Sequence, residues 1–155
     1  MKRIALLLAL ACSLQPAGAM LRGTTDLGVH FVSGGVGTEE VATLNDEKKR
    51  YALAVLTAAK GSGAFLADVR VRISDDQSKL VLDTVMDGPW LLVDLPAGRY
   101  QVEASQGARV QKKPVTIGAG DHRQTVFYFD THDQVEIGSP SGLVTDDSPA
   151  TDAVR

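Results

Sequence analysis

The sequence predicts an all-β protein, a seven-stranded antiparallel β-sandwich preceded by one short helix. Three observations support this class. Between residues 51 and 130, apolar and polar side chains alternate with a period of two. Turn-forming residues interrupt this alternation about every ten positions, as they do in sandwiches and barrels. The single cysteine lies outside this stretch, so apolar packing rather than disulfide bonds must hold the sheets together.

Residues 1–19 have the composition of a secretory signal peptide. Lys2 and Arg3 precede an apolar run over residues 4–14, and small residues follow up to Ala19, after which we expect cleavage. The run is shorter than the roughly 18 to 20 residues that cross a bilayer. In an alternative reading, Cys12 is a lipidated terminus, although the residues before it match that signal loosely. We therefore expect a periplasmic or secreted chain without a transmembrane segment.

Loss of the signal peptide changes both the charge and the available chemistry. It removes Lys2, Arg3 and Cys12 but no acidic residue, so the net charge falls from −3 to −5. Without cysteine, thiol catalysis, disulfides and thiolate–metal sites are excluded. A negative chain without a basic stripe also argues against a nucleic-acid partner.

Residues 20–37 are rich in glycine and show no sustained period, which predicts an irregular arm with room for one strand at residues 29–32. The region 38–50 that follows is expected to hold a short helix.

Thr38 is the predicted N-cap of this helix, over about residues 39–49. Acidic Glu39 and Glu40 lie in its first turn and basic residues 48–50 in its last, the order that the helix dipole favours. Its apolar face is narrow, so we expect it on the surface, adding little to the core.

The sandwich domain is expected over residues 51–130, with strands at residues 51–59, 67–74, 80–86, 90–95, 99–105, 109–117 and 124–130. Pro114 lacks a backbone donor, so its strand should be an edge strand or contain a bulge. Gly98 closes a turn in which it can adopt a positive φ. Residues 131–155 carry five acidic residues, one basic residue and several helix and strand breakers, which predicts a disordered acidic tail.

Residues 84–102 carry a family resemblance. Their sequence, Thr-Val-Met-Asp-Gly-Pro-Trp-Leu-Leu-Val-Asp-Leu-Pro-Ala-Gly-Arg-Tyr-Gln-Val, resembles the carboxypeptidase regulatory-like domain, whose usual run is Thr, Gly, aromatic, Leu-Pro-x-Gly-x-Tyr-x-Val. With the glycine-rich residues 33–37 and the helix, the chain resembles small exported bacterial proteins that carry this module alone. The resemblance implies a transthyretin-like or immunoglobulin-like sandwich. Val85 departs from the Asp or Asn that is common in the family. The pattern should direct Trp90, Leu92 and Tyr100 toward one core face.

Enzymes related to this fold need residues that the sequence lacks. Metallocarboxypeptidases use His-x-x-Glu, but His30, His122 and His132 are followed at the third position by Ser33, Thr125 and Val135. Hydroxyisourate hydrolases, which share the transthyretin-like fold, end in Tyr-Arg-Gly-Ser, unlike residues 151–155 of this chain. Ser62 has no nucleophile-elbow context and no recognisable base. We expect no enzymatic activity.

Three other groups of residues were weighed as ligand sites. His122, Asp130, His132 and Asp133 bracket the last strand and could gather on a metal, but dispersed surface positions are expected. Residues 33–37 could present backbone N–H groups to an anion, but a joint seating the helix is expected. The aspartates, Asp75, Asp76, Asp83 and Asp87, lack the ligand spacing of a calcium loop. No catalytic, cofactor-binding or metal-binding residue is therefore predicted, and no cofactor.

These observations favour an exported, non-catalytic module that acts in protein interaction or envelope structure. Its expected partners are envelope or secreted proteins, met through loops or sheet edges such as the Pro114 strand. The alternative is a periplasmic protein that binds a small ligand or carbohydrate, which exposed aromatic rings would favour. A third possibility, a hydrolase, requires histidines and acids in one pocket.

Overall fold

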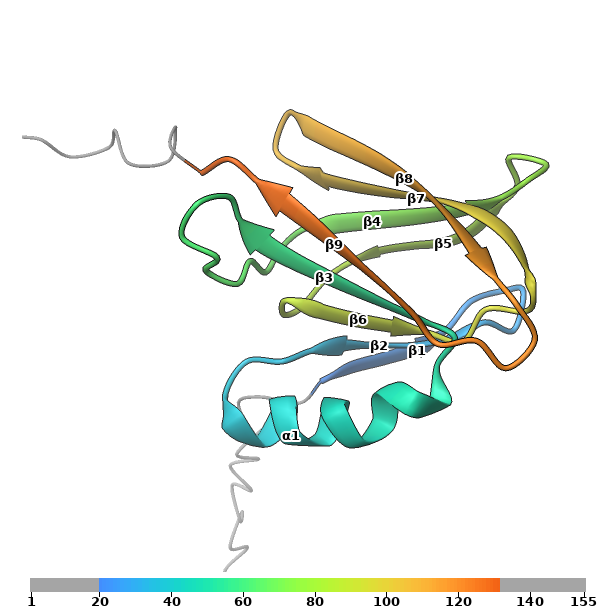
Figure 1. The fold of residues 1–155 in the computed structure, drawn as a ribbon, viewed down its shortest axis with the longest axis horizontal. Coiled ribbons are helices and arrows are strands. Elements are labelled where there is room, and N and C mark those ends of the chain that lie inside the picture. The colour runs from blue at the N-terminus through green and yellow to red at the C-terminus, as the bar shows by residue number, and fades with distance from the viewer. Residues whose placement is uncertain (1–19, 132–155) are drawn as a thin grey trace, which may run out of the picture.

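The structure is a computed structural model that describes residues 20–131 (Figure 1). The predicted signal peptide and nearly all of the predicted acidic tail, with Cys12, His132 and Asp133, lie outside the described residues. Within residues 20–131, no helix has the length and apolar character needed to cross a bilayer.

Nine strands form two sheets that pack face to face, so the predicted sandwich is confirmed (Figure 1). The five-stranded sheet has the order β1 (Leu21–Thr24), β2 (His30–Gly34), β6 (Trp90–Val93), β3 (Leu53–Ala59), β9 (Arg123–Phe129). The four-stranded sheet has the order β5 (Leu80–Val85), β4 (Arg70–Asp75), β7 (Gly98–Gln106), β8 (Arg109–Ile117). One helix, α1 (Thr38–Glu47), continues as a 3-10 turn, Lys48–Arg50, and lies against the outer face of the five-stranded sheet.

All seven strands predicted between residues 51 and 130 are present, but two features of the prediction were wrong. The glycine-rich arm is a β-hairpin, in which β1 pairs with β2 and β2 pairs with β6. The strand allowed at residues 29–32 is present as β2, whereas β1 was missed, because pairing with β2 and not its own composition stabilises it. In addition, β9 runs parallel to β3, with Leu53 opposite Arg123, so the sandwich is not wholly antiparallel.

The main core lies between the two sheets. Alternate residues of almost every strand point inward, and Phe127 and Phe129 of β9 are fully buried there. The largest side chains in this core come from both sheets: Leu53, Ile73, Leu82, Met86, Leu91, Phe127 and Phe129. Because burial of apolar side chains is the main favourable contribution to folding, this core stabilises a domain whose described residues contain no cysteine.

A second, smaller core lies between α1 and the five-stranded sheet. Leu44 of α1 packs there against Val32, Ala54 and Leu92, and Trp90 is partly buried beside them. The helix lies on the surface, as expected, and contributes a single buried side chain, Leu44, to this smaller core. Trp90 and Leu92 were predicted to share one core face with Tyr100, but they lie in this smaller core instead. Because β6 is buried on both faces, its even-numbered residues face α1 and its odd-numbered residues face the main core.

Tyr100, by contrast, packs against the main core, and its hydroxyl donates to the carbonyl of Pro96 at 2.9 Å. This bond closes the turn that carries the family resemblance. Gly98 does not adopt the expected positive φ; it is the first residue of β7, and a Cβ there would lie 3.3 Å from the Tyr100 hydroxyl. The motif glycine thus makes room for the tyrosine ring.

Replacing Trp90 with alanine tests the two-core arrangement. Because the ring is only partly buried under α1, we expect Trp90→Ala to lower the free energy of unfolding by about 2 kcal/mol, less than the ~3 to 5 kcal/mol expected for Phe127→Ala in the main core. Denaturant unfolding measures both values. Equal losses would contradict the separation of the two cores.

Candidate functional site

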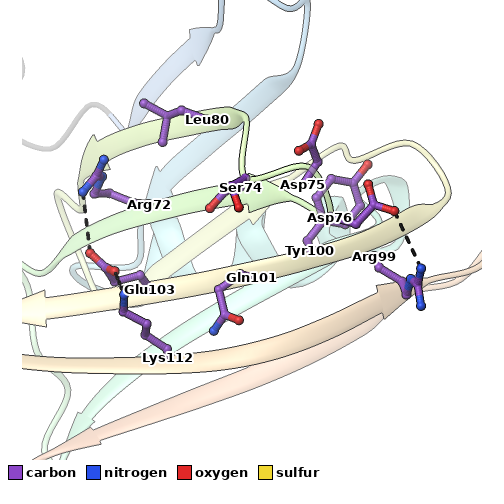
Figure 2. A pocket seen from close by; sticks show the side chains of 11 residues that line it. Arg72, Ser74, Asp75, Asp76, Leu80, Arg99, Tyr100, Gln101, Glu103 and Lys112 are labelled. Atoms are coloured by element: carbon purple, nitrogen blue, oxygen red, sulfur yellow. Dashed lines mark ion pairs between the residues drawn. The ribbon is translucent and has the colours of Figure 1, made fainter.

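A row of alternating charges crosses the outer face of the four-stranded sheet, and Figure 2 shows three of its members, Arg72, Glu103 and Lys112. Strand register places Asp83 (β5), Arg72 (β4), Glu103 (β7) and Lys112 (β8) side by side, one on each strand. Lys112 Nζ lies 2.8 Å from Glu103 Oε2, Arg72 Nη1 lies 3.8 Å from Glu103 Oε1, and Arg72 Nε lies 3.6 Å from Asp83 Oδ2. We call these four residues the charged row.

Arg70 strengthens one end of the charged row. Its Nε and Nη2 each donate to an Asp83 carboxylate oxygen at 2.8 Å, the forked geometry that arginine and carboxylate favour. This hydrogen-bonded guanidinium holds the pKa of Asp83 below its ordinary value.

Beside the charged row lies an open hollow of about 540 Å³. Ser74, Gln101 and Leu80 line its floor and side, and Asp76 pairs with Arg99 at its far end at 3.8 Å (Figure 2). Asp75 belongs to a turn, because its Oδ1 accepts the N–H groups of Gln77 and Lys79. The charged side chains of this hollow are therefore engaged with one another, as on a solvated sheet face.

The side of the sandwich where β8 meets β9 is closed by side chains. Arg109, Gln111 and Lys113 of β8 donate to the backbone carbonyls of Asp130, Tyr128 and Val126 along β9, with the Gln111 bond at 2.6 Å. The Lys113 ammonium also lies 5.0 Å from the centre of the Phe127 ring. These bonds occupy the outward carbonyls of an edge strand that would otherwise be open to another strand.

The opposite side of the sandwich, where β5 lies near β1, is open. Two hollows of about 450 and 290 Å³ lie along β5, each lined on one side by β5 or the residues after it and on the other by β1 or the β1–β2 turn. Half of the large apolar side chains that are exposed in residues 20–131 line these hollows: Leu21, Leu27, Leu80 and Val85. We call the two hollows together the β5 groove.

Within the described residues, the histidines and acids that were weighed as a metal site are not gathered in one place. His122 lies just before β9 and Asp130 just after it, so the strand separates them. His122 Nδ1 contacts the Tyr51 carbonyl oxygen at 3.0 Å, and His30 Nδ1 contacts Thr24 Oγ1 at 2.8 Å. Residues 20–131 hold no group of three or more His, Cys, Asp or Glu side chains arranged to bind a metal.

The glycine-rich residues 33–37 do bind an anion, but it is the chain's own. The Glu40 carboxylate accepts the backbone N–H groups of Gly35 and Val36 at 2.9 and 3.0 Å. Gly37, with φ 89°, precedes the helix and Thr38 is its first residue, so the predicted N-cap at Thr38 was wrong. Glu40 takes over the role of the missing cap from the third helical position. The segment is thus a joint that seats the helix, as expected.

The other singled-out polar residues have local roles. Ser62 Oγ accepts the N–H of Ala64 within a turn. The N–H of Asp87 donates to the buried Ser33 hydroxyl at 2.9 Å. After Asp87, Gly88 passes so close to the Gly34 carbonyl that a side chain there would collide with it.

Sequence reasoning did not identify the charged row, the β8–β9 bonds or the β5 groove. Each depends on which strands become neighbours across a sheet or between sheets. The alternating arginines and acids did signal an outward polar face, but not its cross-strand order.

Comparisons with known proteins give little further information. No family model matches the chain, and no curated protein matches it. Among solved structures, the 5-hydroxyisourate hydrolase of Klebsiella pneumoniae is similar over 50% of this chain and 88% of that one, with 21% sequence identity and a TM-score of 0.43. At this level of similarity the match carries no information about activity. The resemblance to the carboxypeptidase regulatory-like domain stays a resemblance over nineteen residues.

The charged row makes a pH-dependent prediction. Because the folded pKa of Asp83 is lowered, its ion pair with Arg70 stabilises the fold above the unfolded pKa of about 3.9, and this stabilisation is lost as the pH falls through the folded pKa. Thermal melting should therefore show Asp83→Asn melting below the parent at pH 7 and close to it at pH 2. The same gap at both pH values would contradict the assignment.

Proposed function

We propose that this chain is an exported, non-catalytic β-sandwich module that binds another periplasmic or secreted protein. The observation that carries the proposal is the difference between the two sides of the sandwich. The β8–β9 side is closed by side-chain bonds to backbone, while the β5 side is open and lined by exposed apolar residues. Exposed apolar surface next to the free edge of a strand is typical of protein-binding surfaces.

The strand that contains Pro114 is an edge strand, as the sequence predicts, but it is the less suitable edge for a partner. Pro114 has no N–H to donate, and Lys112 and Lys113 precede it in the same strand. Natural edge strands use both proline and lysine against strand addition. The inward side chains of β8 are also committed to β9. We therefore assign the interaction to β5.

Photo-crosslinking tests the assignment with a matched pair of positions. Val85 and Val110 lie in one row of the four-stranded sheet, at its β5 and β8 edges, and are 50% and 54% exposed. With a photoreactive residue at each position in turn, in cells that export the chain, we expect a discrete protein adduct at Val85 and none at Val110. Equal labelling at both positions, or none, would contradict the proposal.

A second candidate function, carbohydrate binding, is favoured by one observation. Phe65 and Tyr128 are 60% and 52% exposed and flank Ala58 in one row on the outer face of the five-stranded sheet. Two exposed rings on a flat face can stack against sugars.

Intrinsic fluorescence titration with cello- and chito-oligosaccharides tests this alternative. Carbohydrate binding predicts saturable changes that Phe65→Ala abolishes and Leu27→Ala, a control on the other side of the molecule, does not. A signal that Phe65→Ala leaves unchanged would count against it.

A further inference from the structure

The β5 groove also indicates the chemistry of its occupant, provided that the proposed interaction function holds. Among the described residues, β5 pairs with β4 alone, so its outer edge is free to accept another strand. Its six residues include no lysine and no proline, and its only irregularity is a bulge opposite Ile73 and Ser74. Of the four edge strands, β8 carries proline and lysines, β9 is covered by β8, and β1 has four residues with a glycine. β5 is therefore the least protected edge.

The walls of the groove suit an extended segment. Leu80 and Val85, at the two ends of β5, are 45% and 50% exposed, and strand register places them on the outer face of the sheet with Arg70 and Ser74. Leu21 of β1 and Leu27 of the β1–β2 turn line the hollows from the other side at 41% and 47%. A strand added to β5 would extend the four-stranded sheet. Since successive side chains of a strand alternate between faces, one set of the added strand's side chains would lie beside Leu80 and Val85 on the outer face, and the other set would lie toward Leu21 and Leu27.

Acidic residues give the β5 groove a negative charge. Asp26 and Asp83 line one hollow, and Asp68 and Asp87 line the other. Asp83 is neutralised by Arg70 and Arg72, whereas Asp26, Asp68 and Asp87 have no cationic partner within residues 20–131.

Among residues 20–131, Arg22 is the only cation that lines either hollow, and it is already engaged. Arg22 donates two bonds to the Glu47 carboxylate, at 2.9 and 3.0 Å. Electrostatic complementarity therefore favours a basic occupant. A second copy of the chain would bring acid against acid, and so would residues 132–155, which carry five acidic residues and one arginine.

We propose that the β5 groove binds an extended segment of a partner protein that carries both apolar residues and lysine or arginine, added as a fifth strand beside β5. Backbone hydrogen bonds to β5 would provide affinity, the leucine and valine walls would receive the apolar residues, and the three unpaired aspartates would select the basic ones.

Fluorescence anisotropy with designed peptides tests the proposal. The probe is an eight-residue labelled peptide that alternates lysine with valine or threonine, and its counterpart has glutamate in place of lysine. With the mature full chain at low ionic strength, we expect the lysine peptide to bind at least about tenfold more tightly than the glutamate peptide. Asp26→Lys combined with Asp87→Lys should remove this preference.

Two exposed substitutions at matched positions provide the control. Val85→Lys should weaken binding of the lysine peptide about tenfold, while Val110→Lys, in the same row at the β8 edge, should change it less than about twofold. Melting curves of the variants verify that each is folded.

Four results would overturn the proposal: equal affinity for the two peptides, equal effects of the two valine substitutions, self-association that Val85→Lys abolishes, or tighter peptide binding after Val135→Ser with Ile137→Ser. The third would identify a second copy as the occupant, and the fourth the chain's own C-terminal segment. A crosslinked adduct at Val85 without preference for the lysine peptide would retain the interaction function and reject only this partner chemistry.

Discussion

Unpaired backbone at the edges of two open sheets is the constraint on which this structure depends. A sandwich with separate sheets has four edge strands, and the unpaired N–H and C=O groups of each can form hydrogen bonds with a strand of another chain. Here the edges are treated differently. β9 gives carbonyls to Arg109, Gln111 and Lys113, β8 contains Pro114, and β1 is short, so β5 is left as the accessible edge.

The outer faces of the two sheets differ in the side chains that cover them. The four-stranded sheet meets water through the charged row, in which each carboxylate lies beside a cation, so little net charge accumulates. The five-stranded sheet is apolar on its outer face as well, and α1 covers part of it with Leu44 against Val32 and Leu92. Beyond the helix, Phe65 and Tyr128 remain exposed. The outer face of the four-stranded sheet is thus suited to contact with water, whereas the exposed apolar residues of the five-stranded sheet are suited to contact with a ligand or another protein.

Much of the fold could be predicted from sequence, because alternation reports local burial. Strands such as β7, with Val102 and Ala104 inward and Arg99 and Glu103 outward, carry their own signal. The β1–β2 hairpin and the parallel β3–β9 pair do not, since both are determined by partners distant in sequence. Trp90 was misplaced because a strand covered on both faces has no polar side to fix its orientation. The absence of a catalytic motif could be judged from spacing, whereas the β5 groove joins residues about sixty positions apart, such as Leu21 and Val85.

The proposed function and the proposed occupant both depend on which edge of the sandwich a partner strand occupies. Backbone amide chemical shifts of the isotope-labelled mature chain, followed during titration with the lysine-rich peptide, locate that edge residue by residue. We expect the changes to concentrate in β5 and in the β1–β2 turn around Leu27. Changes confined to β8 and β9, or spread over the charged row, would contradict it.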